Sequence, residues 1–275
     1  MGRYSHERKR EKSMSYETII LTKKDSILHV KLNRPDFLNA INIKLAEELS
    51  QVAEEADRDK EVKVVILSGE GRAFCSGGDI SFLQKISAMN AAEVRSFVLG
   101  VERQLGRIAF IDKPVIAAIH GFALGAGLSL ALLCDICIAT ENALLGMEFI
   151  KIGIIPELGV KHLLPRLVGV TKAMELALTG DRINGKEAER IGLINRAVPE
   201  DQLEAVTSEL AKKIVGLAPI AIQLAKKSLK GDILQGLDAA FEYEADLNSI
   251  CYLTEDFREA AQAFMEKRKP VFKGR

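Results

Sequence analysis

Two glycine-rich runs in this chain have residue types that expose backbone N–H groups to a bound anion. The first is Phe74-Cys75-Ser76-Gly77-Gly78-Asp79, and the second, further along, is His120-Gly121-Phe122-Ala123-Leu124-Gly125-Ala126-Gly127. Each follows a β-like run and leads into a helical pattern, and small side chains there leave N–H groups uncovered. A helix that begins near Gly127 adds its partial positive charge. Together the two loops predict a site that holds an oxygen anion, such as a thioester enolate, between two amides.

A carboxylate, Glu157, stands among apolar residues in Gly153-Ile154-Ile155-Pro156-Glu157-Leu158-Gly159. Partial burial would raise its pKa toward that of a useful general base. The alternative interpretation is a carboxylate at the start of a helix over Val160–Leu167, where it stabilises the helix dipole. We favour the catalytic role for Glu157 and keep the structural one open.

Several other motifs are incomplete. Gly125-Ala126-Gly127 begins like a dinucleotide fingerprint, but Leu130 occupies the third glycine position, and a nucleophile elbow fails because Ala131 replaces its closing glycine. Cys134 and Cys137 have CxxC spacing without a second pair, so we interpret them as buried small hydrophobes. Structural roles are expected for three scattered histidines, His29, His120 and His162. We therefore expect no metal and no cofactor.

Alternating strand and helix patterns predict an α/β fold with mostly parallel strands, followed by helices. The expected strands are Thr18–Thr22 paired with Ile27–Asn33, then Glu61–Ser68, Pro114–Ile119 and Asp135–Thr140. The expected helices are one capped by Asn42, then Ala91–Ile111 and Gly127–Leu133, and, beyond Gly180, Leu203–Val215, Pro219–Leu229, Leu234–Leu247 and Glu255–Lys267. Thr254 is expected to cap the last helix, with Phe257, Ala260, Ala261 and Phe264 on one face.

Composition narrows the functional class. The chain has 275 residues, 48% of them hydrophobic, and equal numbers of basic and acidic residues (38 each), which argues against nucleic acid as a partner. No apolar run is long enough to cross a membrane. The four cysteines show no disulfide framework, so a reducing cytoplasmic setting is expected. We interpret residues 1–14 as a disordered tail or as sequence upstream of a true start at Met14.

The motifs, taken in order, resemble the crotonase superfamily, the enoyl-CoA hydratase/isomerase proteins. The matching runs extend from Tyr16 to about Lys273 and include Leu32-Asn33-Arg34-Pro35, Leu38-Asn39-Ala40, both glycine-rich loops, Cys134-Asp135-Ile136, Lys151-Ile152-Gly153, Ala177–Ile183 and Phe264–Lys269. The resemblance implies a crotonase-like spiral of ββα units over residues 15–200. It also implies a C-terminal helical trimerisation segment over residues 201–275, with cores packed into homotrimers or homohexamers.

The resemblance also assigns residues to an acyl-CoA site. The N–H groups of Gly78 and Ala126 would bind the thioester carbonyl of the substrate. Five residues would line the CoA channel, namely Phe37, Leu38, Ala40, Ser76 and Asp79, while Phe264 and Lys267 would contact CoA from a neighbouring subunit. Coenzyme A would enter only as part of the substrate.

The chain departs from the hydratase pattern at both catalytic glutamates. Those glutamates fall here at Ser129 and Phe149, which we keep among the substrate-binding residues; Ser129 is a poor base and Phe149 cannot transfer protons. Glu148 is adjacent, but on a strand it would face the opposite way. We therefore predict an acyl-CoA double-bond isomerase in which Glu157 moves a proton from C2 to C4. The alternatives are a hydratase that uses Glu157 with Ser129 or an ordered water, and a CoA-ester-binding or RNA-binding protein without catalysis.

Overall fold

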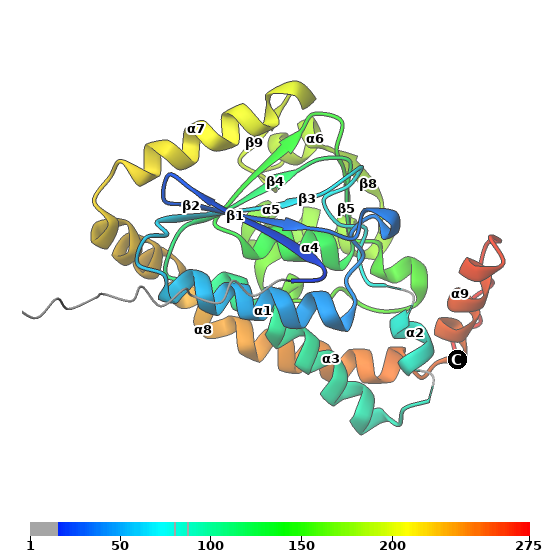
Figure 1. The fold of residues 1–275 in the computed structure, drawn as a ribbon. Helices are drawn as coiled ribbons and strands as arrows, with labels where there is room; N and C mark the ends of the chain where they lie inside the picture. Colours follow the sequence, from blue (N-terminus) through cyan, green and yellow to red (C-terminus); the bar gives the residue numbers. More distant parts are fainter. Residues whose placement is uncertain (1–15, 80, 87) are drawn as a thin grey trace, which may run out of the picture.

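The computed structural model describes residues 16–79, 81–86 and 88–275. The tail predicted for residues 1–14 lies outside the described residues. Strands and helices alternate through most of the remainder (Figure 1), and the strands divide between two sheets. The α/β class predicted from the sequence is confirmed. Within the described residues, no helix combines the length and apolar character that crossing a membrane requires.

The larger sheet has six strands in the order β1-β2-β3-β4-β6-β9, and it is antiparallel only between β1 and β2. These strands are β1 (Ile19–Lys24), β2 (Ile27–Leu32), β3 (Val64–Gly69), β4 (Val115–Ile119), β6 (Ile136–Thr140) and β9 (Arg196–Val198). The smaller sheet contains β5 (Phe122–Leu124), β7 (Leu144–Gly146) and β8 (Arg182–Asn184). From β4 onward the chain passes between the sheets: β5 lies in the smaller sheet, β6 in the larger, β7 and β8 in the smaller, and β9 in the larger.

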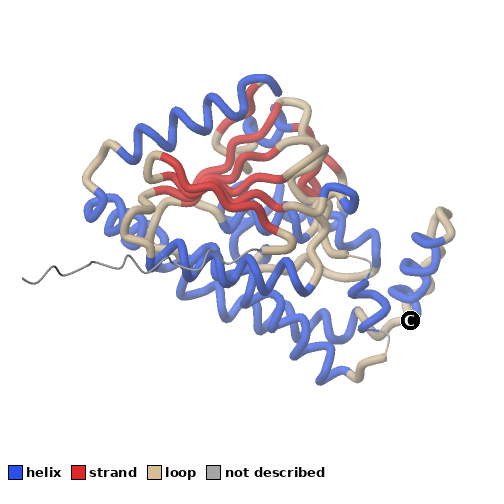
Figure 2. Tube along the Cα trace, in the orientation of Figure 1, coloured by secondary structure: helices blue, strands red, loops and turns tan. Residues whose placement is uncertain are grey.

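Helices cover both faces of the larger sheet. The helices of the described residues are α1 (Ile43–Arg58), α2 (Ser81–Ile86), α3 (Ala91–Gly106), α4 (Ala126–Leu133), α5 (Val160–Thr179), α6 (Gly185–Arg190), α7 (Leu203–Val215), α8 (Pro219–Cys251) and α9 (Glu255–Met265). Short 3₁₀ turns join them at η1 (Pro35–Phe37), η2 (Arg107–Phe110), η3 (Glu148–Ile152) and η4 (Glu200–Gln202). Figure 2 shows the strands enclosed between α7 on one side and the other long helices on the opposite side.

The core follows from the two-residue period of the buried strands. In β3, Val64 and Ile66 pack in the smaller apolar cluster beneath α7, whereas Val65 and Leu67 pack in the main core. A strand that is buried on both faces has an unbroken run of apolar residues in its sequence, and β3 has such a run. The same strands therefore support α7 on one face and the helices that carry the candidate site on the other.

Local signals account for several element boundaries. The β1–β2 hairpin turns at Asp25 and Ser26, both with positive φ, and the side chain of Asn42 accepts a hydrogen bond from the Leu45 N–H at the start of α1. Thr254 caps α9 in the same way, through the Phe257 N–H. These caps agree with the predictions made from the sequence.

Four predictions about elements were wrong. Pro219–Leu229 and Leu234–Leu247 form one helix, α8, rather than two. Glu148 lies in the 3₁₀ turn η3 and not on a strand. Two short strands, β8 and β9, occur beyond Gly180, where only helices were expected. On α9 the buried face contains Phe257, Ala260 and Ala263, while Phe264 is 65% exposed.

Candidate active site

The two glycine-rich loops predicted to bind an anion lie directly against each other. The Cys75 N–H donates to the carbonyl of Phe122 at 3.0 Å, and the Leu124 N–H donates to the carbonyl of Cys75 at 3.1 Å. A Cβ at Gly127 would overlap the Cys75 carbonyl, and one at Gly77 would stand 3.0 Å from the Leu124 carbonyl oxygen. Glycine at both positions therefore allows the loops to make this contact.

The backbone turns of these loops leave two N–H groups without an internal acceptor. Gly77 has φ +109° and Gly125 has φ +50°, values that favour glycine. Ala126 is the first residue of α4, so its N–H is one that the helix itself cannot satisfy. Among the described residues, neither the Gly78 nor the Ala126 N–H donates a hydrogen bond. Both donors are thus available to an oxygen anion.

The residues predicted to line the CoA channel form one strip beside the first loop. The Ser76 N–H donates to the Leu38 carbonyl at 3.0 Å, and the Asp79 N–H donates to the Ile41 carbonyl at 2.8 Å. Ala40 is buried in this strip, whereas Phe37 is 61% exposed. The structure therefore brings Phe37, Leu38, Ala40, Ser76 and Asp79 together with Gly78.

Two residues that sequence reasoning left without a role hold this strip in place. Arg34 forms an ion pair with Asp79 at 2.7 Å, donates to the Ala40 carbonyl, and places its guanidinium 4.7 Å from the centroid of the Phe37 ring. Asn39 is fully buried with φ +56°, and its amide bonds the Arg34 N–H and the Ala73 carbonyl. Asparagine tolerates this left-handed conformation, which was the signal available in the sequence.

The positions at which hydratases carry glutamates lie close to the second loop. Ser129 is fully buried and its hydroxyl donates to the Gly125 carbonyl at 3.2 Å. Phe149 is buried, and its ring would lie 3.8 Å from a Cβ placed on Gly125. Glu148 does not replace the missing acid, because it pairs with Arg182 and Lys151, which lower its pKa against the opposing effect of burial.

Glu157 is half-buried and faces the C-terminal end of α8. Its Oε1 accepts a hydrogen bond of 2.8 Å from the hydroxyl of Tyr252. Burial raises the pKa of Glu157 to about 7, while the Tyr252 hydrogen bond opposes that rise. A carboxyl group with such a pKa can both take and return a proton near neutral pH.

The N-terminus of α5 is satisfied by carboxylates other than Glu157. The Leu158 N–H donates to Glu102 at 2.8 Å, and Glu244 accepts from the N–H groups of Gly159 and Lys161 at 2.7 and 2.8 Å. Burial, together with the charges of Glu157 and Glu244, raises the pKa of Glu102 well above its usual range. Oε2 of Glu102 has no hydrogen-bond partner among the described residues.

Helix α8 contributes two of the polar side chains near Glu157, and Tyr252, the residue directly after α8, contributes a third. Glu244, Asn248 and Tyr252 are spaced four residues apart, and Asn248 bonds both the N–H and the carbonyl of Ile155 at 3.0 and 3.2 Å. Sequence reasoning missed all three. A polar stripe with helical spacing was the signal that could have found them.

The last two predicted substrate-binding residues are Phe264, in α9, and Lys267, just beyond its end. In Figure 1 α9 (red) stands at the margin of the molecule, away from the larger sheet, and it packs on η3. Phe264 and Lys267 are both exposed.

The histidines and cysteines form no second centre in the described part of the chain. His120 Nε2 lies 2.9 Å from the Gly71 carbonyl oxygen, and the ring of His162 packs closely on Gly236. Cys134 and Cys137 are buried as expected, and their thiols contact the carbonyls of Leu130 and Ala131. Across the residues described, no three His, Cys, Asp or Glu side chains are arranged to hold a metal ion.

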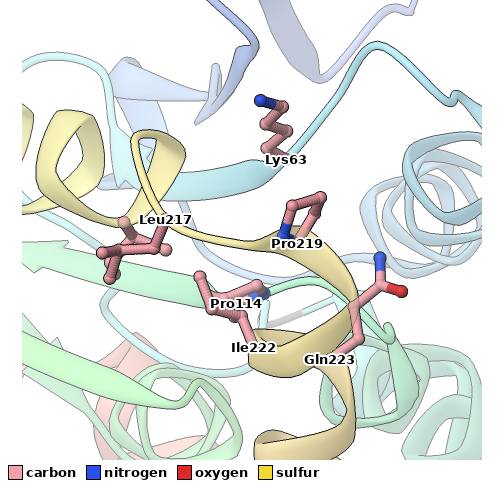
Figure 3. Close-up of a pocket in the computed structure, with 7 residues that line it drawn as sticks. Lys63, Pro114, Leu217, Pro219, Ile222 and Gln223 are labelled. Carbon is pink, nitrogen blue, oxygen red and sulfur yellow. The ribbon is translucent and has the colours of Figure 1, made fainter.

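A shallow crevice lies at the opposite end of the strands. Figure 3 shows it between the residues that precede β3 and β4, Lys63 and Pro114, and the α7–α8 junction with Leu217, Pro219 and Ile222. Sites in parallel sheets form beyond the carboxyl ends of strands, where the two glycine-rich loops lie. The crevice therefore takes no part in the site.

Known proteins resemble this chain over nearly its whole length. The enoyl-CoA hydratase/isomerase family profile matches residues 22–275. A short-chain-enoyl-CoA hydratase of Clostridium acetobutylicum is 39% identical over 93% of this chain and 97% of its own length. A peroxisomal Delta(3,5)-Delta(2,4)-dienoyl-CoA isomerase of Arabidopsis thaliana is 34% identical over 94% of this chain and 98% of its own length.

Solved structures show the same fold. The crystal structure of an enoyl-CoA hydratase from Mycobacterium avium subsp. paratuberculosis superposes with a TM-score of 0.83 at 32% identity, over 94% of this chain and all of the other. The crystal structure of an enoyl-CoA hydratase/isomerase from Pseudoalteromonas atlantica superposes with a TM-score of 0.84 at 28% identity, over 94% of this chain and all of the other. The resemblance inferred from the motifs and the spiral fold that it implied are thereby confirmed. This chain belongs to the enoyl-CoA hydratase/isomerase family, with the crotonase fold.

Proposed function

We propose that this protein is an enoyl-CoA isomerase that shifts a double bond from C3–C4 to C2–C3 of an acyl-CoA thioester. The observation that carries the proposal is the contrast between Glu157 and the two hydratase positions. Glu157 is a carboxylate with a pKa of about 7, whereas Ser129 donates its hydroxyl to a carbonyl and Phe149 has no proton to transfer. The only side chain in this set that suits proton transfer at neutral pH is Glu157.

The contacts at the start of α5 support the same proposal. If Glu157 served to cap the helix, its carboxylate would accept from the N–H groups that follow it. Those N–H groups bond Glu102 and Glu244 instead, and the carboxylate of Glu157 turns to Tyr252. The helix-start role therefore does not account for Glu157.

In the proposed reaction Glu157 removes a proton from C2 of the 3-enoyl thioester. The electrons of the broken C–H bond move into the thioester, and the N–H groups of Gly78 and Ala126 stabilise the resulting dienolate oxygen. The double bond then re-forms between C2 and C3 as Glu157 returns a proton to C4. One base suffices, since the proton leaves and returns on one face, and no water is added.

The raised pKa of Glu157 determines how the isomerisation rate should change with pH. Glu157 must be deprotonated to accept the C2 proton, so isomerisation should increase as the pH rises through about 7. The same shift destabilises the folded protein at higher pH. Because the pKa of Glu157 is higher in the folded state, its favourable contribution is present below its usual value of 4.5 and is lost as the pH rises through 7.

A hydratase is the second candidate, and the names of relatives favour it. Most of the similar curated proteins are named as hydratases, including a crotonyl-CoA hydratase of Syntrophomonas wolfei that is 38% identical. Hydration here would require Glu157 to work with Ser129 or an ordered water. A CoA-ester-binding or RNA-binding protein without catalysis is the third candidate, and it would bind without turnover.

The direct test of the base is the variant Glu157→Gln, which keeps the side-chain shape but cannot accept a proton at neutral pH. We expect the conversion of short 3-enoyl-CoA to 2-enoyl-CoA, followed by absorbance of the conjugated thioester, to fall at least a hundredfold. A matched control is Glu175→Gln on the surface of α5, which should retain wild-type activity. Full activity in Glu157→Gln would remove Glu157 from the reaction.

We further propose that the active form is a homotrimer or homohexamer. Four large apolar residues of α9 and the segment after it are exposed in the single chain, Phe264, Met265, Val271 and Phe272. Such a surface suits burial against another copy, from which Phe264 and Lys267 would reach the neighbour's CoA. The four free cysteines suit a reducing compartment, and we place the protein in the cytoplasm on that ground.

A further inference from the structure

Tyr252 lies immediately beyond α8 and contacts the candidate base. It is 9% exposed, and its hydroxyl donates to Oε1 of Glu157 at 2.8 Å. We propose that Tyr252 is a positioning residue for the isomerisation: its hydrogen bond fixes the Glu157 carboxylate and sets the pH range in which it acts as a base. The proposal rests on the function proposed above and adds a residue to that site.

The backbone around Glu157 is already held on both sides. Asn248 bonds the N–H and carbonyl of Ile155, and Glu102 and Glu244 bond the N–H groups of Leu158 and Gly159. What remains free is the rotation of the Glu157 side chain, and a long carboxylate side chain loses appreciable entropy when it is fixed. The Tyr252 hydroxyl supplies the one hydrogen bond found for that carboxylate among the described residues.

The ring of Tyr252 is itself fixed by α9. Phe257, in the first turn of α9, meets it edge-on with ring centroids 4.7 Å apart and planes at 84°. Phe257 is buried and its N–H is bonded by the cap residue Thr254. Docking of α9 therefore determines where the Tyr252 hydroxyl points, and through it where the base points.

With Oε1 bonded to Tyr252, the two carboxylate oxygens of Glu157 are no longer equivalent. Oε2 makes no hydrogen bond with the residues described, so it is the oxygen left to take the C2 proton. A base held in one orientation avoids a reorganisation that a freely rotating carboxylate would need at each turnover. Loss of the tyrosine hydroxyl should therefore lower kcat more than it changes KM.

Titratable groups from three helices surround Glu157 and affect its titration. They are Glu102 of α3, Glu244 and Cys251 of α8, and Lys161 of α5, which offsets the charge of Glu244. Burial raises the pKa of Tyr252 far above its usual range, so the hydroxyl stays protonated as a donor throughout. A donor to the charged carboxylate favours the ionised form and lowers the pKa of Glu157.

The test compares the variants Tyr252→Phe and Tyr243→Phe. Tyr252→Phe keeps the ring that packs on Phe257 and removes only the hydroxyl. Tyr243 is a matched control because it lies in α8, the helix that Tyr252 directly follows, is half exposed, and interacts through its ring face with Lys161. For Tyr252→Phe we expect kcat for 3-enoyl-CoA to fall about tenfold with KM changed less than twofold, and the apparent pKa of the rate profile to rise by about one unit. Tyr243→Phe should match the wild type in kcat, in KM and in the apparent pKa of the rate profile.

A second substitution at Tyr252 should lower the apparent pKa of the rate profile instead of raising it. Replacement of Tyr252 by 3,5-difluorotyrosine leaves its size nearly unchanged and makes the phenol a stronger donor, so the apparent pKa should fall below that of the wild type. A rate profile that keeps the wild-type pKa in both variants would overturn the positioning role. If Glu157→Gln is inactive while Tyr252→Phe is unchanged, only the role of Tyr252 fails; if Glu157→Gln is fully active, the proposed base fails with it.

Discussion

At the scale of single residues, the proposed site uses backbone groups to bind the oxyanion and a side chain to transfer the proton. The donors of Gly78 and Ala126 are main-chain N–H groups, so the identities of these residues matter only through the backbone shape that they permit. In the proposed reaction, by contrast, proton transfer depends on the Glu157 carboxylate and on Tyr252, which donates a hydrogen bond to it. Substitutions should therefore affect the two functions differently.

Ala126→Pro is the sharpest change to the backbone part of the site. Ala126 is the first residue of α4, where proline fits the helix geometry and no intrahelical bond is lost, so the fold should survive. Removal of its N–H should lower the isomerisation rate about a hundredfold or more. Ala126→Gly keeps the donor and should be mild. If Ala126→Pro, shown by circular dichroism to be folded, turns over at the wild-type rate, Ala126 does not bind the oxyanion.

At the scale of elements, α4 must approach the first glycine-rich loop closely for the two donors to meet. Gly127 lies inside α4 against the Cys75 carbonyl, and the approach leaves no space for a side chain. A glycine in a helix interior normally costs stability relative to alanine. Here the close packing reverses that preference.

Gly127→Ala and Gly100→Ala test this reversal. A Cβ at Gly100, in α3, meets nothing within 4 Å, so that variant should be stabilised by up to about 1 kcal/mol. Gly127→Ala should lose about 1–3 kcal/mol in the free energy of unfolding, because backbone must shift, and should lose activity as the loops separate. Urea unfolding measures the change in the free energy of unfolding in both variants. Equal stabilisation of the two variants would show that α4 can move away at no cost.

Elements with strong local signals were predictable, and those decided by distant contacts were not. The Asn42 cap and the apolar face of α1 required only nearby residues. The predicted break between two helices near Gly231 does not occur. Lys230 pairs with Asp135 at 2.7 Å and Leu237 is fully buried, and these tertiary contacts stabilise α8 as one continuous helix across the glycine. Tyr252 was missed for the same reason: its partner Glu157 lies far away in sequence.

At the scale of the whole molecule, α9 links the proposed base, Glu157, to the molecular surface through Tyr252. Its inner face holds Phe257 against Tyr252, while its outer face exposes Phe264. A neighbouring subunit that covers the outer face would hold α9 in its docked position. Assembly and catalysis would then depend on the same helix.

Sedimentation of the purified protein tests this dependence on assembly. We expect a trimer or hexamer at micromolar concentration, because the exposed apolar residues of α9 and the following segment are otherwise left in water. Phe264→Asp, which places a charge in that surface, should shift the protein toward smaller species and weaken binding of CoA esters. A stable monomer with full activity would contradict both the assembly and the shared CoA site.

The most direct measurement of the central claim is the wild-type rate in two reactions on the same short acyl chain. One assay follows 3-enoyl-CoA becoming 2-enoyl-CoA, and the other follows water adding to 2-enoyl-CoA, both through absorbance of the conjugated thioester. We predict rapid isomerisation and slow hydration, since Phe149 occupies the place of the second acid, with most isomerisation retained in Ser129→Ala. Rapid hydration by the wild type that is lost in Ser129→Ala would contradict the account and identify a hydratase.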